Sequence, residues 1–325
     1  MFFLTTYGVL NIAAGIEKFL RSPSFRPTFK VHWFFSFLGA IACLWVMLLI
    51  NSLATFVAIA FVTVIYFILK SSQLKSVWGN VGRGIRMAII RATLIKLGED
   101  HEPKNWRPHP MVLVGSPTKR WHLIDFANTF THKRGILSIA SVLPKGVIGN
   151  EQIVNMRHHI RDYVVKKGVE ALVKVIAAPN PYIGVSRLVE SYGLGALQPN
   201  TIIVGASENE EGREDFCEMI QRFYELQRNV LIVHKGNEEE PFGKYKRIDV
   251  WWGGLKGNGG LMMILAYLMN HSVAWRQSVV HIKMVVDDPK AIEAAEENIA
   301  NILDEIRIDA QIDIIAIKNK SFDEI

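Results

Sequence analysis

A run of 37 residues without a charged side chain, residues 33–69, constrains the fold more than any other feature. A membrane-spanning helix needs about 20 apolar residues, so the run is too long for one span. It divides at Asn51-Ser52 into residues 34–50 and 53–69, 17 residues each. This predicts two membrane helices joined by a tight polar turn. The alternative is a buried helical hairpin of a soluble domain, which is disfavoured because soluble helices normally keep one polar face.

Charge is unevenly divided along the chain. Residues 1–98 hold ten Lys or Arg and one acid, a net charge of +9, whereas residues 99–325 have a net charge of −3. Nucleic-acid binding is not indicated, because it needs a basic patch on the folded domain. The loop 17–32 and the segment 70–96 are basic and the turn at Asn51 is uncharged. By the positive-inside rule, we expect an integral protein of the inner or plasma membrane with a cytoplasmic C-terminal domain.

Residues 1–16 are also apolar and predict a third span, with a core helix as the alternative. They lack the basic start and the cleavage site of a signal peptide. The predicted membrane region is therefore residues 1–70. Its two longer spans carry small residues at helical spacing, which lets helices approach closely in lipid. Packing within the hairpin and a dimer contact are both open for these positions: Ser36, Ala40, Cys43, Ala54 and Ala58.

Residues 71–109 are interpreted as a basic connector helix and a polar linker. Within 81–97 two apolar stripes lie on opposite sides of a helical wheel, and Ile85 and Ile89 belong to one of them. A surface helix has one apolar face. Two stripes favour a helix clamped on both sides, by its own domain and by a partner copy. A basic helix lying on the membrane surface is the alternative.

Residues 110–325 alternate short apolar runs with helical patterns. This alternation predicts an α/β domain with a mainly parallel sheet covered on both faces. A polar connector divides it into halves of about 110–236 and 247–325. The expected strands are 111–117, 136–144, 171–179, 201–207, 229–236, 247–252, 279–286 and 310–317.

Nothing in the sequence resembles a nucleophile–base arrangement, so we expect neither an enzyme nor catalytic residues. The ten histidines are scattered, and Cys43 and Cys217 fit neither a metal site nor a disulfide. Two glycine turns follow the first and fourth expected strands. Ligands of doubly wound sheets bind at the carboxyl ends of strands, and glycine lets backbone N–H groups approach a phosphate. The candidate nucleotide-binding residues are Gly115, Ser116, Pro117, Gly205, Ala206 and Ser207. Ordinary tight turns are the alternative, because no phosphate-binding fingerprint is present.

Six segments, in order along the chain, resemble the C-terminal portion of cation-chloride cotransporters, the sodium-potassium-chloride and potassium-chloride symporters. They are FFLTTYGVLNIA (2–13), SPSFRPTFK (22–30), FSFLGAIACLWVMLLIN (35–51), NWRPHPMVLVGSP (105–117), LGALQPNTIIVG (194–205) and IDVWWGGLKGNGGLMMILAYLM (248–269). The resemblance implies the last membrane helices of a symporter that moves chloride with potassium, sodium or both. It also implies a homodimer and a cytosolic regulatory domain of universal-stress-protein-like fold, with an adenine nucleotide such as ATP as candidate ligand.

This sequence departs from the family pattern in two ways. The long regulatory insertion of animal members is reduced to about 237–246, which indicates a compact, prokaryotic-type member and puts control by phosphorylation in doubt. The ion sites of the family lie in earlier helices of an inverted-repeat core, which would be a separate N-terminal partner of this part. The alternative function is a self-standing, membrane-tethered, nucleotide-sensing α/β domain.

Overall fold

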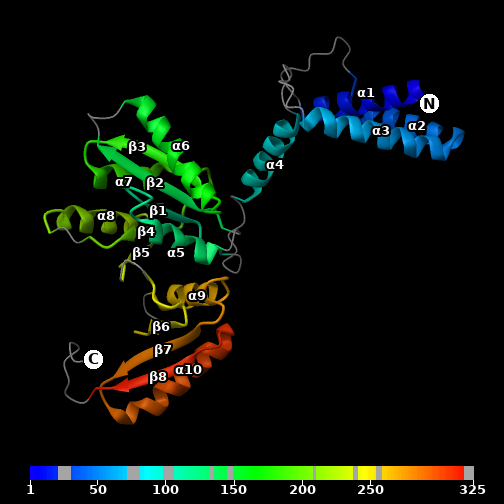
Figure 1. Ribbon diagram of the computed structural model, residues 1–325. Coiled ribbons are helices and arrows are strands. Elements are labelled where there is room, and N and C mark those ends of the chain that lie inside the picture. Colours follow the sequence, from blue (N-terminus) through cyan, green and yellow to red (C-terminus); the bar gives the residue numbers. More distant parts are fainter. Residues whose placement is uncertain are drawn as a thin grey trace. The chain divides into compact units, whose positions relative to one another are not determined.

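The computed structural model describes residues 1–20, 31–71, 81–97, 106–131, 135–144, 149–207, 210–236, 241–253 and 258–317. The chain forms two compact units, Met1–His101 and Glu102–Ile325 (Figure 1). The SPSFRPTFK segment and residues 237–240 of the connector at 237–246 lie outside the described residues.

The first unit is helical. Its elements are α1 (Phe2–Phe19), α2 (Trp33–Ile50), α3 (Ser52–Ser71) and α4 (Val81–Leu97). Asn51 breaks the apolar run in an extended conformation, and its side-chain oxygen accepts a hydrogen bond from the backbone N–H of Ala54. The hydroxyl of Thr55, which is fully buried, donates to the carbonyl oxygens of Met47 at 2.9 Å and Asn51 at 2.8 Å. These bonds satisfy backbone groups at the junction, so the predicted turn is confirmed.

One helix among the described residues, α2, is long and apolar enough to cross a membrane by length and composition. The apolar part of α3, Ser52–Ile68, is shorter. Three spans are therefore not confirmed, and for α1 and α3 the span remains a prediction. Within α2 only Ser36, Ala40 and Met47 are buried. A core helix would bury its bulky apolar side chains, so this exposure favours contact with lipid.

The second unit begins with a five-stranded parallel sheet in the order β3-β2-β1-β4-β5. Its strands are β1 (Pro110–Leu113), β2 (Ser138–Pro144), β3 (Leu172–Ala178), β4 (Thr201–Gly205) and β5 (Asn229–Val233). The helices between them are α5 (Trp121–Thr131), α6 (Asn150–Lys166), α7 (Pro181–Ser191) and α8 (Arg213–Glu225).

Both faces of this sheet are covered. Val112, Ile139 and Ile203 pack with α5 and α6 in one apolar cluster. The alternate residues Met111 and Ile202 pack with α7 and α8 in another. Because side chains alternate across a strand, buried runs with apolar residues at every position require such a two-faced core. The prediction of a parallel α/β domain is confirmed.

The remaining strands form a second parallel sheet in the order β6-β7-β8. They are β6 (Arg247–Trp251), β7 (Val279–Val286) and β8 (Gln311–Ala316), and they alternate with α9 (Gly259–Asn270), a short 3₁₀ turn (Pro289–Ala291) and α10 (Ile292–Ile306). A separate cluster that includes Trp252, Trp275 and Ile282 forms the core of this half. Leu265 of α9 belongs to the core of the five-stranded sheet, so α9 contributes to both cores.

Candidate functional site

The order of the five-stranded sheet places its topological switch between β1 and β4. From β1 the chain proceeds to β2 and β3 on one side, and β4 and β5 lie on the other. Ligands of open parallel sheets bind outside the carboxyl ends of the strands at such a point. A pocket of about 280 Å³ lies there, and Gly115, Gly205, Ala206 and Ser207 all line it. Four of the six residues predicted from the glycine turns therefore come together.

The other two predicted residues, Ser116 and Pro117, do not line this pocket. Pro117 is buried, and the hydroxyl of Ser116 lies 3.0 Å from that of Thr118. The turn after β1 is held by the hydroxyl of Ser141, which donates to the carbonyl of Gly115 at 3.2 Å. The sequence gives no reason to distinguish Gly115, Ser116 and Pro117. In the fold only Gly115 lines the pocket.

Glycine at these two turns leaves open space. A Cβ atom added to Gly115 would meet nothing within 4 Å, so packing does not impose glycine there. At Gly205 the nearest atom to such a Cβ would be Nη1 of Arg120, at 3.5 Å. The absence of both side chains therefore keeps the backbone accessible from the pocket and within reach of a guanidinium group.

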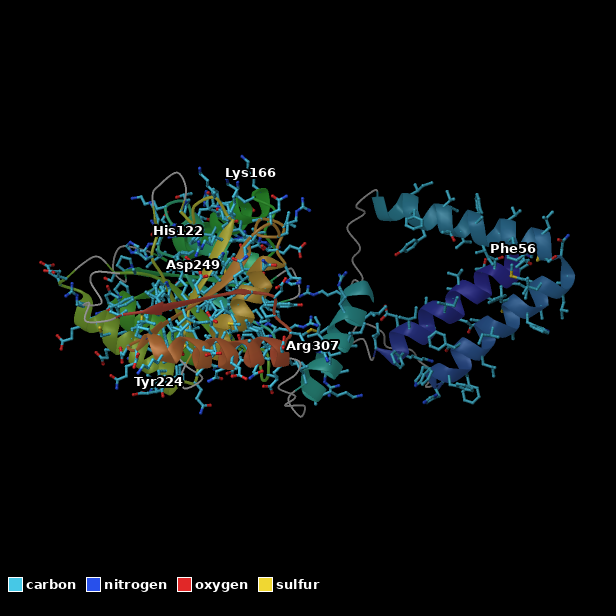
Figure 2. All side chains as sticks on the ribbon, turned by 90° about the horizontal axis from the view of Figure 1, so that it is seen from below. Phe56, His122, Lys166, Tyr224, Asp249 and Arg307 are labelled. Carbon is cyan, nitrogen blue, oxygen red and sulfur yellow. The ribbon has the colours of Figure 1, made fainter. Side chains whose placement is uncertain are left out.

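Arg120 is the functional candidate that the sequence analysis missed. It is exposed, it lines the pocket, and in the described part of the chain it forms no ion pair. Burial lowers the pKa of His122, labelled in Figure 2, and the charges of Lys235 and Arg120 lower it further. Positive charge thus gathers at this end of the sheet, as an anionic ligand requires. A base within one turn of a glycine after a strand is the signal that could have identified Arg120.

The opposite wall of the pocket is apolar and is built by α7 and α8. Tyr182 and Val185 come from α7, and Phe216 comes from α8. Asn180 caps α7, because its side-chain oxygen accepts from the N–H of Tyr182 at 2.8 Å. A Cβ added to Gly184 would lie 2.5 Å from Cβ of Ala178 and 2.7 Å from Cγ1 of Val142, so glycine lets α7 lie close against the sheet. A flat apolar wall facing a basic glycine edge suits an adenine base and its phosphates.

In the membrane unit the candidate packing residues have mixed surroundings. Ser36 and Ala40 are buried within the unit, and a Cβ on Gly8 of α1 would approach Cβ of Cys43 to 3.7 Å. That side of α2 therefore packs within this chain. Ala54 and Ala58 are half-buried, whereas Ile85 and Ile89 of α4 are exposed by 39% and 57%. Exposed apolar side chains on α4 leave a surface that a further helix could cover.

Metal ligation has no support in the residues described: no group of three or more His, Cys, Asp or Glu side chains converges there. Cys43 and Cys217 are free thiols.

Comparison with known proteins gives a consistent result. The model of solute carrier family 12 matches residues 120–239 and 241–323. Potassium/chloride cotransporter 3 of Caenorhabditis elegans is 28% identical over 340 residues, covering 97% of this chain and 31% of that protein. The chain therefore spans about a third of the length of this relative.

At the low sequence identities found, the solved structures support the fold alone. The crystal structure of the cytoplasmic domain of a prokaryotic cation chloride cotransporter aligns with a TM-score of 0.50 and 17% identity, covering 66% of this chain and 80% of that one. A putative universal stress protein from Pseudomonas aeruginosa UCBPP-PA14 gives a TM-score of 0.42 at 11% identity, covering 64% of this chain and 74% of that one. The expected universal-stress-protein-like fold therefore remains a prediction.

Proposed function

Since the chain belongs to solute carrier family 12, we propose that it is the C-terminal part of a cation-chloride symporter that moves chloride with potassium, sodium or both. The observation that carries this proposal is the family match across both halves of the α/β unit. The relative aligned over nearly the whole chain is a potassium/chloride cotransporter. The ion sites would lie in a transport core outside these 325 residues, and these residues would supply membrane scaffold and a cytosolic regulatory domain.

Transport assays test whether the ion sites lie outside this part of the symporter. Vesicles that contain only this chain should show no chloride-dependent rubidium or sodium uptake. The same chain fused behind the transport core of a family member should restore uptake in a core that is inactive without its own C-terminal part. Chloride-dependent uptake by the chain alone would contradict the proposal. Failure of the fusion, with the chain folded and inserted, would favour the alternative of a self-standing nucleotide sensor.

We further infer three membrane spans with the α/β unit in the cytoplasm. The charge asymmetry around the apolar segments supports this topology. In a Cys43→Ala background, a membrane-impermeant maleimide applied to intact cells should label Asn51→Cys. It should label the native Cys217, which is exposed, only after the membrane is permeabilised. The reverse pattern would overturn the orientation.

We propose that the homodimer forms through α4 and that Ala54 and Ala58 of α3 form a second dimer contact within the membrane. The exposed apolar stripe that contains Ile85 and Ile89 supports it. In a background without native cysteines, Ile89→Cys should form an intermolecular disulfide under mild oxidation. The matched variant Arg86→Cys, on the polar side of α4, should not. Equal cross-linking at both positions would indicate random collision.

For the pocket between β1 and β4 we propose an adenine nucleotide such as ATP. The convergence of Gly115, Gly205 and Arg120 supports the phosphate side, and Tyr182 and Phe216 support the base side. In Gly115→Val the added side chain should occupy the pocket without a clash at Cβ and should abolish ATP binding in calorimetry. Ser116→Ala is the matched control, because it lies beside the pocket and does not line it. ATP binding unchanged in Gly115→Val would place the nucleotide elsewhere.

A further inference from the structure

A second pocket, of about 430 Å³, lies at the opposite, amino-terminal edge of the five-stranded sheet. It is enclosed by the starts of β2 and β3, the last turn of α7 and the segment 192–199 that follows it. Its volume falls within the range of about 300–1,000 Å³ that small-molecule sites occupy. None of the glycine turns that suggested a nucleotide takes part in it, and the two pockets share no lining residue.

The apolar body of this pocket is formed by leucines. Leu188 is buried, whereas Leu172 and Leu194 line the pocket and remain 56% and 67% exposed. A soluble protein gains little from holding two leucines exposed around one hollow. A ligand with an apolar body would bury both.

The lip of the pocket has a fixed shape. Backbone hydrogen bonds join Leu194 and Leu197 in both directions, at 3.2 and 3.0 Å. Gly193 has φ +123°, and a Cβ added there would lie 2.6 Å from the carbonyl oxygen of Leu197. Only glycine fits this conformation and this approach. The fold therefore holds the rim in place before any ligand binds.

Three of the polar side chains that line the pocket, those of His109, Lys174 and Tyr192, can donate a hydrogen bond to a ligand. Nδ1 of His109 accepts from the N–H of Ile136 at 3.0 Å, so in the neutral ring the proton is on Nε2. Burial lowers the pKa of His109, and the charge of Arg107 lowers it further, which keeps the ring neutral near pH 7. Nε2 is thereby left as a donor.

Two more donors come from the sheet and the end of α7. The hydroxyl of Ser138 donates to Oη of Tyr192 at 3.3 Å, which leaves the phenolic proton of Tyr192 for another acceptor. Lys174 of β3 forms no ion pair within the described part of the chain. The residues that line the pocket include no Asp or Glu.

We propose that this pocket binds a small organic anion, a carboxylate on an apolar body. Lys174 would pair with the carboxylate, Tyr192 and His109 would donate hydrogen bonds to it, and the leucines would cover the apolar body. Three donors, one of them the Lys174 ammonium, and no Asp or Glu among the lining residues select an anion over a neutral amide, since only the anion gains the charge interaction with Lys174. Charge complementarity and the volume of the pocket thus define one class of occupant.

The test uses the full chain in lipid nanodiscs with 4-phenylbutyrate as the probe and 4-phenylbutanamide as its uncharged counterpart. Saturation-transfer NMR, with empty nanodiscs subtracted, should show saturable binding of the acid and at least about tenfold weaker binding of the amide. Lys174→Gln and Tyr192→Phe should each weaken the acid by about three- to tenfold. Lys166→Gln, which makes the same charge change at the exposed end of α6 (Figure 2), should leave binding unchanged.

Several outcomes would overturn the proposal. They are no saturable binding of the acid, equal binding of acid and amide, or equal affinities of the wild type and Lys174→Gln. Loss of binding in Lys166→Gln would place the anion elsewhere. Lys174 and Tyr192 are not fully buried, so we expect their substitution to leave the Tm unchanged. An unchanged Tm would show that a loss of binding is not a loss of folding. Because the probe carries no base or phosphate, the result is independent of whether ATP binds at the other edge.

Discussion

Gly184 allows a direct test of how α7 is seated on the sheet. An alanine there would place its Cβ 2.5 Å from Cβ of Ala178 and 2.7 Å from Cγ1 of Val142. Carbon atoms pack at about 3.5–4.0 Å, so α7 would have to move away from β2 and β3 by about 1 Å. Alanine is better than glycine inside a helix by about 1 kcal/mol, but overpacking a core costs about 1–3 kcal/mol. The net effect of Gly184→Ala is therefore a loss of up to about 2 kcal/mol.

The assay is thermal unfolding of the full chain, followed by the tryptophan signal of the α/β unit. In a unit of this size 1 kcal/mol corresponds to about 2–4 °C, so Gly184→Ala should lower Tm by up to about 8 °C. Gly260→Ala is the matched control, because this glycine also lies in a helix and a Cβ there would meet nothing within 4 Å. Its Tm should stay level or rise slightly. A Gly184→Ala variant whose Tm rises as much as that of Gly260→Ala would refute the close seating of α7.

Three further predictions concern charged groups. Burial lowers the pKa of His109 below its ordinary 6.5, so near that pH the unfolded chain binds more protons than the folded chain. The free energy of unfolding should therefore fall as the pH drops through 6.5. In urea titrations, His109→Gln should show a shallower fall of this free energy with pH. Arg120→Gln should raise the pKa of His122 toward its ordinary value in an NMR titration, because one neighbouring charge is removed, and should weaken ATP binding, whereas Lys119→Gln should leave ATP binding nearly unchanged. Burial alone would raise the pKa of Asp249 (Figure 2), but bonds from Arg247 at 2.6 Å and Lys283 at 3.0 Å lower it below its ordinary 3.8. Asp249→Asn should cost about 1–2 kcal/mol near pH 7, and this cost should shrink as the pH falls below 3.8. A cost that does not change with pH would contradict the network.

Much of the fold could be read from the sequence because the signals are local. Largely apolar runs such as Thr201–Gly205 indicate strands buried on both faces, and the structure confirms this strand. The turn at Asn51 could be located because a polar pair interrupts an otherwise apolar run. The division into two sheets was not foreseen as such, since sequence periodicity reports the face that a strand buries and not which strands pair.

The candidate sites were harder to predict, and the reason is geometric. Gly115 and Gly205 could be found because strand ends are visible in the sequence and parallel strands bring them to one edge. Arg120 lies on a turn whose direction only the fold sets. The amino-edge pocket joins His109, Lys174 and Tyr192 from three distant segments, and no spacing rule links them.

α7 connects the two proposed sites. Its first turn lines the nucleotide pocket with Tyr182 and Val185, and its last turns line the amino-edge pocket with Leu188 and Ser191. The helix has 11 residues, so it is about 16 Å long and is held by its Asn180 cap and by the contact at Gly184. If a short helix pinned in this way shifts as one body, a ligand that draws one end toward the sheet would change the seating of the other end.

Such coupling between two binding sites must be reciprocal. If 4-phenylbutyrate changes the affinity for ATP by some factor, ATP must change the affinity for 4-phenylbutyrate by the same factor. Typical couplings of about 1–3 kcal/mol correspond to about 5- to 150-fold, which calorimetry with and without the second ligand would resolve. Gly184→Ala, which lifts α7 from the sheet, should reduce that factor, whereas Gly260→Ala should not. Affinities that stay independent while both ligands bind would show that α7 is too firmly seated to transmit the change.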